Sequence, residues 1–196
     1  MSLVELIARA DERALAVGGL ACLDRCLPLL GGDDEVLRPL WASLADGSGW
    51  AGDLARARDL LGAGRPPGDE AALLVHRMLE SAPAERTAGA LRPWADACSA
   101  ASLRIHRLLD PAAGDDVLRP DAGDTGGPDT GDAVGPSPLV AAELRRQAMV
   151  LELLADHGAQ GLRRALEVTV EGRRVLRAVV SRRARNTVEA GARAAL

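Results

Sequence analysis

The chain has 196 residues, 47% of them hydrophobic, and a formal net charge of −4 at pH 7. This length provides one well-buried core, or one core with a smaller appendage, and argues against two full-sized domains. The sequence contains three Trp but neither Phe nor Tyr. Its core must therefore be built mainly from Leu, Val, Ala and Trp, and small side chains of this kind favour closely packed helices.

All 24 basic residues are Arg, as is typical of a GC-rich genome, so the abundance of Arg does not by itself indicate an anion-binding site. Charged residues interrupt every apolar run before it reaches membrane-spanning length, and the first residues do not resemble a secretion signal. The three cysteines lack the dense spacing of a disulfide framework. We therefore expect a cytoplasmic protein with no membrane association.

Periodic apolar residues separated by Gly, Pro and Asp predict a mainly α protein. The first 110 residues are expected to form a bundle of about five or six short, proline-punctuated helices. Ser2 and Glu5 have the spacing of a capping box at the start of the first helix, which Gly18 and Gly19 are expected to end. Further helices of the bundle are expected at about residues 20–30, 34–46, 50–61, 69–79 and 84–109.

Residues 111–138 have a different composition from the rest of the chain. Of these 28 residues, 17 are Gly, Pro or Asp. Such a stretch cannot bury enough apolar surface to offset the entropy lost on ordering it. It is predicted to be a long disordered loop or flexible linker.

The charge differs on the two sides of this linker. Residues 1–110 contain 12 Arg and 16 acidic residues, whereas residues 139–196 contain 11 Arg and six acidic residues. The chain is thus predicted to join an acidic helical bundle (1–110) through a linker (111–138) to a basic C-terminal segment (139–196). Because 58 residues are marginal for an independent core, this segment is expected to dock on the bundle or on a second subunit.

The C-terminal segment is predicted to begin with a helix after Ser137, a good capping residue followed by proline. Residues 165–181 then fit two structures. Apolar residues at alternating steps of three and four favour a helix packed closely at Gly172. Alternation of β-branched residues also allows a β-hairpin that turns at Gly172. We favour the helix, since a lone hairpin would have only helices to pack against.

A near-repeat supplies the candidate metal ligands. His76 and Glu80 are spaced i and i+4, as are His106 and Asp110 thirty residues later. Each pair would share one face of a helix, and two such helices side by side could offer iron, manganese or zinc two imidazoles and two carboxylates. The Glu-x-x-His pattern of di-metal bundles is absent, however. The simpler interpretation is two exposed pairs that stabilise their helices slightly.

The remaining reactive and aromatic side chains are interpreted as core residues. They are Cys22, Cys26, Cys98, Trp41, Trp50 and Trp94. Arginine clusters at 145–146, 163–164, 173–177 and 182–185 could contact phosphates, but no aromatic residue follows Trp94 to stack on single-stranded bases. Complementing the acidic bundle, within one molecule or between two, is the favoured role of these arginines.

No phosphate-binding loop, serine-hydrolase or zinc-protease motif is present in the sequence. Catalytic and cofactor-binding residues therefore cannot be assigned, and no cofactor is expected. The leading hypothesis is a non-enzymatic helical module for protein–protein interaction or regulation, with a protein partner or a homo-oligomer. One alternative is a small helical metal-binding protein or enzyme that uses the paired His and carboxylate residues. Another is a DNA-binding regulator that uses the Arg-rich C-terminal segment.

Overall fold

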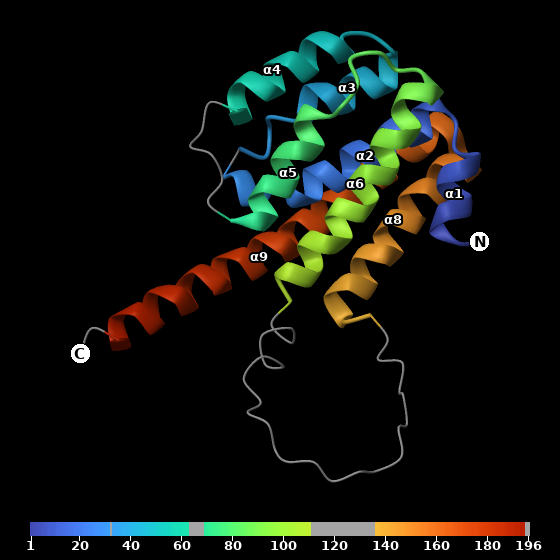
Figure 1. Ribbon diagram of the computed structural model, residues 1–196. Helices are drawn as coiled ribbons and strands as arrows, with labels where there is room; N and C mark the ends of the chain where they lie inside the picture. Colours follow the sequence, from blue (N-terminus) through green and yellow to red (C-terminus); the bar gives the residue numbers. More distant parts are fainter. Residues whose placement is uncertain (32, 63–68, 111–135, 195–196) are drawn as a thin grey trace, which may run out of the picture.

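A computed structural model describes residues 1–31, 33–62, 69–110 and 136–194, with side chains described as far as residue 187. Every regular element in this part of the chain is a helix, and no strand occurs there (Figure 1). The mainly α fold predicted from the sequence is therefore confirmed. Within the same described residues, no helix is long and apolar enough to span a membrane.

The first helix, α1 (Leu3–Arg9), starts at the predicted capping box. The Ser2 hydroxyl accepts from the Glu5 amide at 3.3 Å, and the Glu5 carboxylate accepts from the Ser2 amide at 2.8 Å. The helix ends earlier than predicted, because the Asp11 side chain accepts from the Ala14 amide at 2.8 Å and caps the next helix, α2 (Glu12–Cys26). The predicted break at Gly18 and Gly19 is wrong, since both lie inside α2.

Gly19 is needed inside α2 for packing against α6 (Ala88–Leu108). A Cβ atom added at Gly19 would lie only 2.4 Å from the Trp94 ring. The glycine thus gives the indole room against the helix backbone, and here tertiary packing overrides the local tendency of Gly to interrupt a helix.

Helix α2 is the centre of the fold, with 12 of its 15 residues buried. It packs against α6 and also against α8 (Pro138–His157) and α9 (Leu162–Ala194), which the short turn η3 (Gly158–Gly161) connects (Figure 1). Side chains of α8 and α9 belong to the same hydrophobic core as those of α1, α2 and α6. Helices far apart in the sequence therefore meet at α2.

The remaining helices form an outer layer around one side of α2. They are η1 (Leu27–Leu30), α3 (Arg38–Asp46), α4 (Trp50–Gly62) and α5 (Glu70–Glu80). The three Trp fill space beneath this layer as predicted, and each has 6% or less of its surface exposed. Each indole N–H also donates a hydrogen bond. Trp41 donates to the Asp24 carboxylate, Trp50 to the Pro83 carbonyl and Trp94 to the Met78 carbonyl.

Helix α9 is continuous across residues 165–181, so the helix predicted there is confirmed and the hairpin alternative is wrong. The close packing expected at Gly172 is also present, because an added Cβ atom would lie 2.4 Å from Cδ of Arg25. As a helix, this β-branched stretch can pack its Gly172 against α2, and this tertiary contact favours the helix over the hairpin. The far end of α9 projects away from the other helices (Figure 1).

The predicted linker lies outside the described residues from 111 to 135. Its predicted disorder, and the division of the chain into an acidic bundle, a linker and a basic segment, stay predictions.

Candidate functional site

Polar side chains from three helices meet in the interior, and we call this group the buried cluster. It consists of Cys22, Arg25 and Cys26 from α2, Ser99, Ser102 and His106 from α6, and Glu143 and Gln147 from α8. Arg25 is 1% exposed and Glu143 is fully buried. Because ionised groups are costly to bury, the contacts among these residues decide what the cluster can do.

Arg25 and Glu143 form a two-pronged ion pair. The Arg25 Nε donates to Glu143 Oε2 at 2.9 Å, and Nη2 donates to Oε1 at 2.6 Å. The same carboxylate also accepts from the Ser102 hydroxyl at 2.8 Å and from the Gln147 amide at 2.9 Å. Oε1 thus accepts from three different side chains, whereas Oε2 accepts only from Arg25, and Arg25 Nη1 is buried with no hydrogen-bond partner among the described residues. Most of the buried charge is therefore compensated by hydrogen bonds, which is how a buried ion pair is tolerated.

Both members of the pair are ionised at neutral pH. Burial alone raises the pKa of Glu143, but the Arg25 charge and hydrogen bonds outweigh burial and lower this pKa to about 2. Burial likewise works against the Arg25 cation, yet Glu143 raises the pKa of Arg25 overall. The carboxyl group therefore cannot serve as a proton donor near pH 7.

His106 contributes a neutral imidazole to the cluster. Its Nδ1 lies 2.7 Å from the Ser102 carbonyl oxygen, and since a carbonyl only accepts, Nδ1 carries the proton. Its Nε2 lies 3.6 Å from Glu143 Oε2. Burial lowers the pKa of His106 more than the Glu143 carboxylate raises it.

The cysteines are buried and protonated, so the prediction that they are core residues is confirmed. Burial raises the pKa of Cys22 to about 12, although its sulfur lies 3.4 Å from the Arg25 Nη2. Burial also raises the pKa of Cys26 and of Cys98. A thiol without thiolate character is a poor nucleophile and a poor metal ligand.

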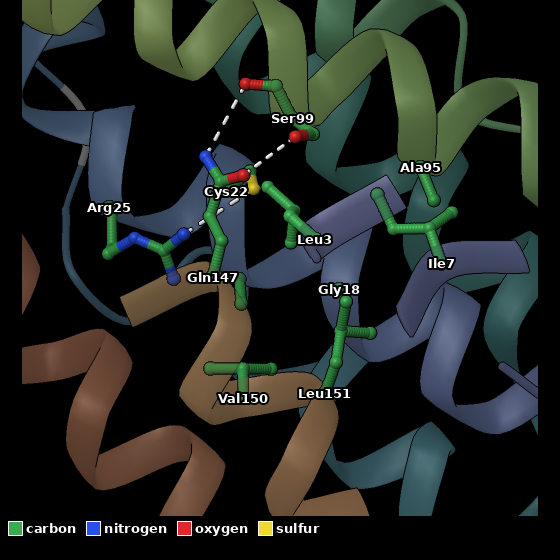
Figure 2. Close-up of a pocket in the computed structure, with 11 residues that line it drawn as sticks. Leu3, Ile7, Gly18, Cys22, Arg25, Ala95, Ser99, Gln147, Val150 and Leu151 are labelled. Carbon is green, nitrogen blue, oxygen red and sulfur yellow. Dashed lines mark hydrogen bonds between the residues drawn. The ribbon is translucent and has the colours of Figure 1, made fainter. Parts of the chain in front are cut away.

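A narrow cavity of about 10 Å³ lies beside the cluster, with α1 forming one wall (Figure 2). The cavity is lined by Ser99 of α6, Gln147 of α8 and Arg25 of α2. The Ser99 hydroxyl donates to the Gln147 side-chain oxygen at 2.6 Å. This volume is close to the minimum for one water molecule and leaves no room for a substrate. The buried cluster thus suits a structural role, which is to hold α2, α6 and α8 together.

A second polar group joins α2 to α9. Arg173 Nη1 donates to Asp24 Oδ1 at 2.7 Å, and the Trp41 indole donates to Asp24 Oδ2 at 2.8 Å. Burial raises the pKa of Asp24, and although Arg173 acts in the opposite direction, burial has the larger effect. The pair therefore contributes more to the placement of α9 than to stability.

An open hollow of about 440 Å³ lies on the surface between η1 and α9, and we call it the α9 hollow. It is lined by Pro28, Gly31, Asp33, Asp34, Arg177, Val180 and Ser181. Arg177 of α9 pairs with Asp34 through both of its terminal nitrogens, one of them at 3.0 Å. Asp33 is exposed beside this pair.

Beyond the hollow, α9 presents arginine to solvent. Residues 181–187 are all exposed, and among the described residues Arg182, Arg183 and Arg185 form no ion pair. Arg183 donates to the Leu108 carbonyl at 2.9 Å. The helix continues beyond Arg183 to Ala194. At about 1.5 Å per residue, Ala194 lies roughly 16 Å farther along the helix axis than Arg183.

The structure separates the four candidate metal ligands by environment. His76 is half-buried and Glu80 exposed on α5, Asp110 is half-buried after α6, and His106 is buried with its Nε2 facing α8. Across the described part of the chain, no three His, Cys, Asp or Glu side chains lie close enough together to hold a metal ion. The contacts therefore give a metal site no support.

The Arg25–Glu143 pair is not predictable from the sequence, because its members are 118 residues apart. A local signal was nevertheless present. Asp24 and Arg25 stand in an otherwise apolar run from Leu20 to Leu27, where a charged side chain needs a buried partner. The sequence does not say which carboxylate that partner is.

Comparisons with protein-family models, with curated proteins and with solved structures found no match to this chain. The class of protein is therefore defined by the structure alone: a mainly α protein with a buried ionic cluster and a projecting basic helix.

Replacing Glu143 tests the role of the buried ion pair. The E143Q variant leaves the Arg25 charge buried without its counter-ion, and we expect its free energy of unfolding to fall by about 3–5 kcal/mol. The control E152Q, at an exposed position on the same helix, should change stability by less than about 0.5 kcal/mol. Urea unfolding followed by circular dichroism measures both. Equal losses in the two variants would show that the pair carries no special role.

The depressed pKa of His106 predicts how stability depends on pH. The folded state binds this proton less readily than the unfolded state, whose pKa is near the ordinary value of 6.5. Stability should therefore be complete above that value and fall as the pH drops through the lower folded-state pKa. We expect the H106Q variant to lose less stability than the wild type between about pH 7 and pH 5. Parallel profiles in urea titrations over this range would contradict a buried neutral imidazole.

Proposed function

We propose that the protein is a non-enzymatic helical interaction module that binds a second copy of itself through the distal half of α9. The observation that carries this proposal is the projection of an exposed, arginine-bearing helix beyond the bundle (Figure 1). Residues 181–187 of this helix are all exposed, so their surface is available to a partner.

The proximal half of the same helix indicates the chemistry of that partner. Arg173 pairs with Asp24, and Arg177 pairs with Asp34, so arginines of α9 bind carboxylates of the N-terminal helical region within one molecule. The distal arginines Arg182, Arg183 and Arg185 offer the same chemistry and form no ion pair within the part of the chain that the structure describes. A second copy supplies one, because its first 110 residues carry 16 acidic residues and 12 Arg.

The buried cluster supports a role in interaction more than one in catalysis. Its carboxylate is held ionised by Arg25, its thiols are protonated, and the adjoining cavity has room for about one water molecule. Those properties suit a group that fixes helices in place. They do not suit a site that a substrate must enter and leave.

Reversing the distal charges tests the proposal. We expect wild-type protein to self-associate with rising concentration in low salt and to dissociate as salt is added, because exposed ion pairs are screened. The R182E/R183E/R185E variant should sediment as a monomer under the same conditions. Sedimentation velocity over a concentration series measures this.

A matched control is the R145E/R163E/R164E variant, which changes the net charge equally at exposed arginines elsewhere on α8 and α9. It should associate like the wild type. A wild-type protein that stays monomeric at every concentration would overturn the proposal. If that monomer binds duplex DNA in a salt-dependent manner, the DNA-binding alternative replaces it.

A further inference from the structure

We infer that the α9 hollow of one copy receives the distal α9 helix of the other, with the two helices antiparallel about a two-fold axis close to Ser181. This inference rests on the proposed self-association and adds the surface on which it occurs. The hollow and the projecting helix lie next to each other in one molecule. In a two-fold dimer, the helix of each copy can therefore enter the hollow of the other.

The face of α9 that borders the hollow continues past the bundle. Arg177, Ser181 and Arg185 are spaced four residues apart and therefore lie on one face of the helix. Arg177 and Ser181 line the hollow, and Arg185 follows one turn later with its side chain exposed. The exposed arginine is thus a direct extension of the surface that already binds Asp34.

Two-fold symmetry turns this arrangement into a complementary contact. In an antiparallel pair centred on Ser181, position 185 of one helix lies opposite position 177 of the other. Position 177 is itself an arginine, but Asp34 already pairs with its charge, so the carboxylate that each Arg185 meets is the exposed Asp33, which forms no ion pair among the described residues. Every such attraction occurs twice, because the same patch is used on both subunits.

The hollow has the space and the charge for this occupant. Its volume of about 440 Å³ is open to solvent, so side chains of a second helix can enter it. Asp33 acts on the Arg177 cation already, since it contributes to the raised pKa of Arg177 after Asp34 itself. At the crossing point, Ser181 and Ala184 are exposed and small, which lets two helix axes approach closely.

A charge exchange between two variants tests this contact. D33R and R185E should each weaken self-association by about tenfold, because each turns two attractions into repulsions. An equimolar mixture of D33R and R185E should form a heterodimer with near wild-type affinity, since one contact then has its native charges, the other has both charges reversed, and both are attractive. Sedimentation velocity measures the association, and native mass spectrometry identifies the heterodimer by its mass.

Two further variants keep the result interpretable. E35R reverses the neighbouring exposed carboxylate without removing the Asp33 turn, in which the Asp33 side chain accepts from the Glu35 amide at 3.0 Å. Because Glu35 does not line the hollow, E35R should associate like the wild type, and a loss of association in D33R alone then points to Asp33. D59R, an exposed reversal on α4 away from the hollow, should associate like the wild type and should not pair preferentially with R185E.

The outcomes separate this inference from the proposed function. If wild-type protein associates and R185E does not, but no mixture restores association, α9 is the interaction element and the hollow is not its docking surface. The inference is then overturned while the proposed function stands. If the wild type does not associate at all, both are overturned. Recovery with D33R, but not with E35R or D59R, is the result expected.

Discussion

The fold depends on burying the charge of Arg25 at the centre of the molecule. The guanidinium lies on α2, and the carboxylate that pairs with it comes from another helix. Glu143 provides this carboxylate from α8, and Ser102 of α6 and Gln147 of α8 also donate hydrogen bonds to it. Since isolated buried charges are far more costly than paired ones, this arrangement selects one way of packing α2, α6 and α8.

The position of α9 follows from the same residue and its neighbour. Gly172 leaves space for the aliphatic part of Arg25, and the next residue of α9, Arg173, pairs with Asp24 next to Arg25. These two consecutive contacts fix both the register and the direction of α9 on α2. Because the helix continues well beyond them, its distal arginines are carried past the edge of the bundle (Figure 1). The buried cluster and the exposed basic surface are therefore parts of one arrangement.

Features that depend on neighbouring residues could be predicted from the sequence, whereas contacts between distant helices could not. Ser2 with Glu5, and the close packing at Gly172, were readable because each depends on a few neighbouring residues or on one glycine. The helix end predicted at Gly19 was wrong, because this glycine makes room for Trp94, which lies seventy-five residues away in the sequence. The Arg25–Glu143 pair could not be assigned for the same reason. The sequence contains charged residues in an apolar run, but the identity of their partners depends on how distant helices pack.

Cross-linking at the helix crossing tests the central claim that α9 of one copy lies against α9 of another. In the S181C variant, the new thiols of two copies meet at the two-fold axis, while Cys22, Cys26 and Cys98 are buried with raised pKa values. Under mild oxidation, S181C should form a disulfide-linked dimer, whereas T187C, exposed but away from the axis, should form far less. Equal yields for the two variants, or no dimer from S181C at concentrations where the wild type associates, would contradict the account.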